Sequence, residues 1–328
     1  MRGWSGEGLR PCSLGTADRW DLVTQLRMRI RDTATAASEA PPLGVIAGAG
    51  HLPVASLQGM RSAGRRVAVV GLRDCFDASL PGQADHFASA GILQPRRWAR
   101  LLRRWGVREA VMVGRVNKLN MYDPMFLVRH FPDAALAWAW TVTCRRDRRS
   151  DKILGALADI IGRGGVKLID STRYIPELMA DAGVMTRNGP SAAQWKDIRF
   201  ALPIVRRMGE LDVGQSVAVR GCEIIAVEAI EGTDLMIDRA GGLCRTGRWT
   251  LLKVAKPEQD LRFDVPTVGP GTIERLIKAG ATCLAVQAGK TIMLEKERTL
   301  EEAGRAGIAV VGLAIDEAGQ WTNDPGGA

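Results

Sequence analysis

The sequence has few of the residues that build metal clusters or disulfide frameworks. Its 328 residues include six cysteines and three histidines, and no CxxC, HxH or HExxH pair occurs. A zinc site or a disulfide scaffold is therefore not expected, and scattered thiols favour the reducing cytoplasm. The cysteines are Cys12, Cys75, Cys144, Cys222, Cys244 and Cys283.

Long apolar runs are also missing. A membrane-spanning helix needs about 20 apolar residues, and no run here approaches that length. The first residues contain no apolar stretch before a small-residue cleavage site, so a secretory signal is not expected. Aromatic residues make up 5% of the chain without an RNA-binding pattern, and nucleic acid is not expected as a partner. GxSxG, Walker lysine-loop, HRD and DFG motifs do not occur.

The overall composition is that of a folded, basic protein, and a basic protein favours anionic partners. Hydrophobic residues are 46% and charged residues 25% of the chain, with a formal net charge of +9. The length suggests two domains. We expect a tail at 1–42, a Rossmann-like α/β domain at 43–165, a mixed α/β catalytic domain at 166–316 and a second tail at 317–328.

Short apolar runs alternate with helical patterns through the first of these domains, which favours a parallel sheet with crossover helices. In the second, β-hairpin and helical patterns mix around a turn near Gly221. The first domain is predicted to have strands at 43–47, 65–72 and 109–113 and helices at 52–62 and 96–105. The second is predicted to have strands at 166–170, 253–255, 284–287 and 308–313, a hairpin within 216–232, and helices at 192–209 and 272–279.

Two loops of the first domain carry phosphate-binding features. The turn at Gly48-Ala49-Gly50 precedes a helix, and free N–H groups at a helix N-terminus attract anions. Pro53 stands where a dinucleotide fingerprint needs its third glycine, which argues against NAD. A phosphate or sugar-nucleotide site and a purely structural turn stay open. The second loop, residues 114–118, follows a predicted strand, and its Arg115 and Lys118 suit a phosphate clamp or a solvated loop.

Two stretches of the second domain carry charge. Residues 231–234 (EGTD) place two acids around a Gly-Thr turn, which suits a divalent metal, a ribose hydroxyl or a helix cap. Residues 252–272 (LKVAKPEQDLRFDVPTVGPGT) combine cations, carboxylates and a turn into a helix. Such a set suits phosphoryl transfer, and a surface loop is the alternative. Its chemical side chains are Lys253, Lys256, Asp260, Arg262, Asp264, Thr267 and Thr272, with Gly269 at the turn.

These motifs occur together in one known family. The chain resembles UDP-2,3-diacylglucosamine pyrophosphatases of the LpxI type in the stretches LGVIAGAGHLP, VGRVNK, ELDVGQSVAV, VEAIEGTD and KVAKPEQDLRFDVPTVGPGTIE. Any one of these stretches is weak, but five in the same order, from about Leu43 to Leu313, are specific. One departure is Ala49, where the family often has glycine.

The resemblance implies an enzyme of lipid A biosynthesis. It implies Mg²⁺-dependent hydrolysis of the substrate pyrophosphate to UMP and 2,3-diacylglucosamine 1-phosphate, with water attacking the phosphorus on the sugar side. Asp264, in the family's RxDxPT motif, is the implied catalytic residue, as a metal ligand or by orienting water. Glu231 and Asp234 complete the predicted metal set. The predicted substrate-binding residues are Gly48, Gly50, His51, Arg115, Asn117, Thr186, Thr233, Asp234, Lys253, Lys256, Arg262, Thr267 and Thr272.

The expected partners follow from a lipid substrate. We expect a cytoplasmic protein that associates peripherally with the inner membrane, and a homodimer is kept open. Trp138 and Trp140 precede a run of arginines that ends at Arg149, and this stretch suits either a membrane contact or a connecting helix with a solvated end. A carrier that binds the substrate without cleaving it and an NAD-dependent oxidoreductase are the alternatives.

Overall fold

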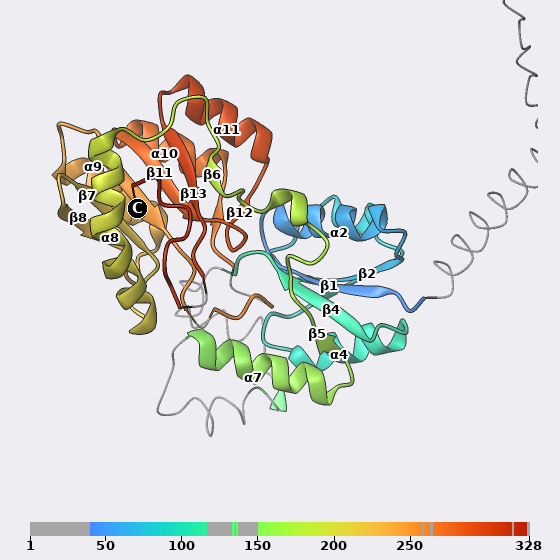
Figure 1. Cartoon of the computed structure of the whole chain (residues 1–328). Coiled ribbons are helices and arrows are strands. Elements are labelled where there is room, and N and C mark those ends of the chain that lie inside the picture. Colours follow the sequence, from blue (N-terminus) through green and yellow to red (C-terminus); the bar gives the residue numbers. More distant parts are fainter. Residues whose placement is uncertain are drawn as a thin grey trace, which may run out of the picture.

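The computed structural model of the chain describes residues 40–116, 133–134, 136, 150–257, 259–262, 265–316 and 318–326. These residues form two α/β domains, each built around its own principal sheet (Figure 1). The predicted fold class, a parallel α/β domain followed by a distinct mixed α/β domain, is confirmed. The four cysteines within the described ranges are free thiols.

The first domain has a five-stranded parallel sheet in the order β3-β2-β1-β4-β5. Strands β1 and β2 are buried throughout, because helices cover both faces of the sheet. Val45 packs with Leu57 of α2, whereas Ile46 packs on the opposite side with Leu102 of α4 and Ile161 of α7. The elements are β1 (Leu43–Ala47), α2 (Leu52–Ser62), β2 (Val67–Leu72), α3 (Leu80–Gln83), β3 (His86–Ala90), α4 (Pro95–Arg104), β4 (Glu109–Val113), α7 (Ser150–Arg163) and β5 (Lys167–Leu168).

Most elements of this domain agree with the sequence prediction. The bounds of β1, α2 and β4 match it residue for residue, and β2 and α4 match within two residues. Neither α3 nor β3 was predicted. The strand predicted at 166–170 is the two-residue β5, which pairs with β4. It thus belongs to the first sheet, although it follows the predicted domain boundary.

The second domain has a mixed six-stranded sheet in the order β6-β13-β11-β9-β7-β8. Strands β9, β11 and β13 are parallel, and β6, β7 and β8 form the antiparallel pairings. Helix α8 packs on one face, and α9, α10 and α11 pack on the other. The elements are η2 (Pro176–Leu178), β6 (Gly183–Val184), α8 (Ala192–Glu210), β7 (Ser216–Arg220), β8 (Glu223–Val227), α9 (Thr233–Leu243), β9 (Trp249–Lys253), β10 (Thr267–Val268), α10 (Pro270–Lys278), β11 (Ala281–Gln287), β12 (Ile292–Met293), α11 (Lys296–Arg305) and β13 (Ala309–Leu313).

One strand of the second domain was predicted at the wrong place. The sequence prediction put it at 253–255, but β9 ends at Lys253. The four residues before Lys253 are fully buried and continue the pairing with β7 and β11, so they form the strand. The predicted hairpin, the helices at 192–209 and 272–279, and the strands at 284–287 and 308–313 are confirmed.

The carboxyl edge of the first sheet is directed toward the second domain. Strand β1 runs from the outer end of the first domain inward, and the other strands of this sheet are parallel to it (Figure 1). The domains also touch where Ser171 donates two hydrogen bonds to the carbonyl of Leu261, from its N–H (3.0 Å) and its hydroxyl (2.8 Å). This contact holds the loop before residue 262 against the first domain.

Candidate functional site

The predicted phosphate-binding residues of the first domain meet at adjacent strand ends. Gly48 follows β1 and Arg115 follows β4, and these strands are neighbours in the sheet. Ala49 and Arg115 exchange two backbone hydrogen bonds of 2.9 Å, so the two loops form one unit. The strand order changes direction between β1 and β4, which is where open α/β sheets bind ligands. Gly48, Gly50, His51 and Arg115 therefore share one edge.

Gly48 and Gly50 of this unit are glycines for different structural reasons. Gly50 has φ of +98°, which favours glycine, whereas Ala49 keeps a negative φ and fits without strain. Gly48 has an ordinary φ, but a Cβ there would lie 2.9 Å from the Arg115 carbonyl oxygen. The alanine that departs from the family's usual loop thus occupies the one position of the three that tolerates it.

Gly114→Ala is expected to destabilise the first domain. A Cβ at Gly114 would lie 2.7 Å from the carbonyl carbon of Gly48, and the φ of +96° adds backbone strain. We expect a loss of roughly 2–3 kcal/mol in the free energy of unfolding, measured by urea denaturation. Gly50→Ala is the matched control, because it has a similar φ but no atom within 4 Å of the added Cβ. Equal losses in both variants would show that strain alone, and not the close approach, governs this turn.

In the second domain, Lys253 is the centre of a buried polar network. Lys253 ends β9, and its side chain is buried with a residue exposure of 7%. Its ammonium group donates hydrogen bonds to the hydroxyl of Thr233 (3.1 Å) and to the carbonyl of Thr267 (3.0 Å). Thr233 opens α9 and Thr267 lies in β10. Lys253 and Thr267 of the stretch 252–272 are thus in contact with Thr233 of the separately predicted EGTD turn.

The network includes a carboxylate that the sequence analysis did not single out. Glu228 follows β8, is 7% exposed, and accepts a hydrogen bond from the Thr233 hydroxyl through Oε1 (3.0 Å). Its other oxygen, Oε2, is buried and has no hydrogen-bond partner among the described residues. A carboxylate oxygen left unpaired in this way is costly, which is typical of a group that meets a ligand or an ion. The sequence signal that could have identified Glu228 is its position in the stretch VEAIEGTD, three residues before Glu231.

The two acids of the EGTD turn, which were predicted as metal ligands, each form an ion pair with an arginine. Glu231 accepts a hydrogen bond of 2.5 Å from Arg239, and Asp234 lies 3.6 Å from the guanidinium of Arg275. Hydrogen bonds from the Glu231 backbone and from Arg239 hold the pKa of the Glu231 carboxyl below its ordinary value. Within the described ranges, no three His, Cys, Asp or Glu side chains form a metal-binding group.

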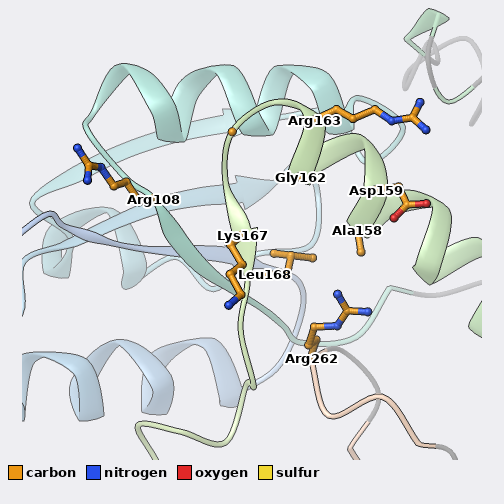
Figure 2. Close-up of a pocket in the computed structure, with 9 residues that line it drawn as sticks. Arg108, Ala158, Asp159, Gly162, Arg163, Lys167, Leu168 and Arg262 are labelled. Atoms are coloured by element: carbon orange, nitrogen blue, oxygen red, sulfur yellow. The ribbon is translucent and has the colours of Figure 1, made fainter.

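Lys256 and Arg262 each contact an acid. Lys256 forms an ion pair with Asp212, and Arg262 forms a bidentate pair with Asp260 whose shortest N–O distance is 2.6 Å. The hydrogen bonds from Arg262 lower the pKa of the Asp260 carboxyl. Figure 2 shows Arg262 reaching toward α7, at a pocket of about 690 Å³. Arg262 therefore lies where its loop meets the first domain.

The remaining predicted threonines have structural partners. The Thr186 hydroxyl donates to the Asn188 carbonyl and accepts from the N–H of Val310, so it holds β13 near its amino end, away from the end of β9. The Thr272 hydroxyl accepts from the N–H of Gly269 and caps α10. Asp264, Asn117 and the 138–149 stretch lie outside the described residues, so their predicted roles stay predictions.

Comparison with known proteins agrees with the resemblance. The LpxI N-terminal domain profile matches residues 42–178, and the LpxI C-terminal domain profile matches residues 181–311. The curated UDP-2,3-diacylglucosamine pyrophosphatase LpxI of Caulobacter vibrioides is 30% identical over 286 residues, which cover 84% of this chain and 98% of that protein. A solved UDP-glucose-4-epimerase from Stenotrophomonas maltophila with bound NAD and a formylated UDP-arabinopyranose is 19% identical, covers 38% of this chain and 34% of its own, and has a TM-score of 0.24, too low to carry an argument. The two domain profiles and the length of the match to the curated relative show that the chain belongs to the LpxI family.

Proposed function

We propose that the chain hydrolyses the pyrophosphate of UDP-2,3-diacylglucosamine, as the name of its relative states, and releases UMP and 2,3-diacylglucosamine 1-phosphate in lipid A biosynthesis. The match over 98% of that relative carries this proposal, because both domains and the segment between them are included. The structure adds two suitable regions, the glycine edge of the first domain and the buried network around Lys253.

The residues of these two regions suit binding of a diphosphate ester. The loops at Gly48 and Arg115 present a cation and helix N–H groups, which suit a phosphate or the nucleotide end of the substrate. Lys253 supplies a positive charge that two hydrogen bonds hold in place, and such preorganised charge stabilises a phosphoryl-transfer transition state. Asp264 is the proposed catalytic residue, three positions before Thr267, whose carbonyl oxygen accepts one of those bonds.

Mg²⁺ is part of this proposal. Bound Mg²⁺ would neutralise charge on the diphosphate oxygens. The unpaired Oε2 of Glu228 has the oxygen chemistry that Mg²⁺ prefers, and we propose Glu228 and Asp264 as its ligands. Glu231 and Asp234 are paired with arginines, so we propose that they contribute to the charge around the site and do not bind the metal directly.

The first test is a product assay with the purified full chain. Incubation with UDP-2,3-diacylglucosamine, Mg²⁺ and ¹⁸O-labelled water is expected to release UMP and to place the label in 2,3-diacylglucosamine 1-phosphate, as attack on the sugar-side phosphorus requires. Label in UMP would contradict that direction of attack. Tight substrate binding without any UMP would favour the carrier alternative.

Removal of the metal is expected to abolish turnover. Excess EDTA should lower UMP release to background, because the diphosphate charge would no longer be neutralised, and added Mg²⁺ should restore it. The control is the same EDTA concentration premixed with an equal excess of Mg²⁺. Full activity in EDTA, with metal content verified as absent by elemental analysis, would overturn the magnesium proposal.

The expected cellular setting follows from the same substrate. Within the part of the chain that the structure describes, no helix has the length and hydropathy to cross a bilayer. We propose that the protein acts in the cytoplasm and reaches its diacyl substrate at the inner membrane surface. A homodimer stays a prediction, to be checked by light scattering of the purified protein.

A further inference from the structure

Helix α4 of the first domain carries a stripe of exposed arginines. Its apolar side chains, including Trp98, Ala99 and Leu102, are buried against the sheet and α7. The opposite side presents five exposed arginines and no acid. Their spacing keeps them on one face of a 3.6-residue helix. The α4 arginines are Arg96, Arg97, Arg100, Arg103 and Arg104.

The charge of this stripe is not balanced by neighbouring acids. Asp133, which lies beside the start of α4, accepts backbone N–H bonds from Arg96 and Leu136. Among the described residues, no α4 arginine forms an ion pair, whereas the exposed arginines of α11 are paired with glutamates at 2.8 Å or less. Several like charges on one face repel one another, and their repulsion is relieved when an anionic surface binds.

The stripe continues into the basic pocket shown in Figure 2. The Arg103 side chain lies against Gly165, which lines that pocket, since a Cβ at Gly165 would be 3.1 Å from its Nε. Three further exposed cations line the pocket, and none has an ion pair within the described ranges. Asp159 is the one acid in the lining. The three cations are Arg108, Arg163 and Lys167.

We propose that the α4 arginines and these three pocket cations, together the basic face, dock the protein on a membrane surface rich in anionic lipid. The proposal rests on the proposed function, because a diacyl substrate must be met at such a surface. Each basic residue near an anionic bilayer contributes about a factor of five in binding, so eight together form a substantial anchor. The proposal does not use residues 138–149, for which a membrane contact was predicted from sequence.

The composition of the basic face favours lipid over nucleic acid. Single strands are held by aromatic side chains that stack on bases, and α4 exposes none, since Trp98 is buried. Trp105, at the end of α4, stacks on His86 with ring centroids 5.7 Å apart. Exposed guanidinium groups on one face of a helix, each carried on an aliphatic stem, suit the phosphate headgroups of a bilayer surface.

Vesicle co-sedimentation of the full chain tests the proposal. The wild-type protein is expected to bind vesicles of phosphatidylcholine with one-quarter phosphatidylglycerol, to bind pure phosphatidylcholine poorly, and to be released by 0.5 M NaCl. The variant Arg96→Gln, Arg100→Gln, Arg103→Gln should bind the anionic vesicles roughly 100-fold more weakly. The matched control, Arg187→Gln, Arg245→Gln, Arg248→Gln, removes the same charge from exposed positions of the second domain and should bind like wild type.

Two further measurements separate the outcomes. UMP release in nonionic detergent micelles should be equal in wild type and the α4 variant, which shows that the variant is folded and that docking is distinct from chemistry. Equal vesicle binding by the α4 variant and the control would overturn the proposed membrane role of the basic face. Tighter binding of the wild-type protein to a 20-base-pair duplex than to anionic vesicles would also overturn it. If the wild-type protein releases no UMP but the α4 variant still loses vesicle binding, the membrane role of the basic face is supported and the proposed function is refuted.

Discussion

Asp264→Asn is expected to lower kcat for UMP release by roughly 10²–10⁴-fold while the protein stays folded. The substitution keeps the side-chain volume and removes the charge, so a carboxylate that orients water or holds Mg²⁺ loses its function. The chain beyond this residue is well anchored: the carbonyl of Pro266 accepts the N–H of Ile292 at 2.8 Å, and that of Thr267 accepts the ammonium of Lys253. Thr267, three positions after Asp264, is therefore held in place beside the Lys253 ammonium group.

The metal dependence of this variant separates the two proposed roles. If Asp264 holds Mg²⁺, the concentration of Mg²⁺ that gives half-maximal rate should rise. If it orients water, only kcat should fall. Asp260→Asn is the control, because Asp260 is the other aspartate in the stretch and is held by Arg262. It should keep most of the turnover. Near-wild-type kcat in Asp264→Asn would refute the catalytic assignment.

The sequence predicted the buried elements well and the edges poorly. Strands β1 and β4 were found because each is a compact apolar run followed by a glycine-containing loop. Helix α2 was found because its apolar residues have helical spacing. Strand β3 reads HFASA and is half-exposed at the sheet edge, so it has little hydrophobic signal. Two-residue strands such as β5 depend on their partner strand and leave no pattern of their own.

The site shows the same division between local and long-range information. The charged stretch around Lys253 was identified from its composition, and the glycine loop was identified from its motif. The contact of Lys253 with Thr233 could not be predicted, because the fold of the second domain brings the end of β9 to the start of α9. The pairing of Asp234 with Arg275 could not be predicted either, because it depends on how α9 packs on α10. The predicted binding of metal by Glu231 and Asp234 stays a prediction.

Lys253→Met is expected to lower kcat by roughly 10²–10³-fold. Methionine keeps the apolar stem of the side chain and removes the ammonium group that two hydrogen bonds hold at the end of β9. The free energy of unfolding should also fall by about 1–3 kcal/mol, because the carbonyl of Thr267 loses its buried donor. Both quantities are measured on the same preparation, by UMP release at saturating substrate and by urea denaturation.

Two companion variants make the Lys253 result specific. Lys278→Met removes an exposed ammonium that pairs with Glu274 at 2.7 Å on α10, and it should change neither quantity appreciably. Lys253→Arg keeps the charge but replaces a compact ammonium by a planar fork, so part of the turnover should return if charge is what matters. A folded Lys253→Met protein with kcat within about threefold of wild type would show that this buried cation stabilises the second domain and does not act on the diphosphate. At about 1.4 kcal/mol per tenfold change in rate, a threefold loss is far smaller than the stabilisation expected from one preorganised charge.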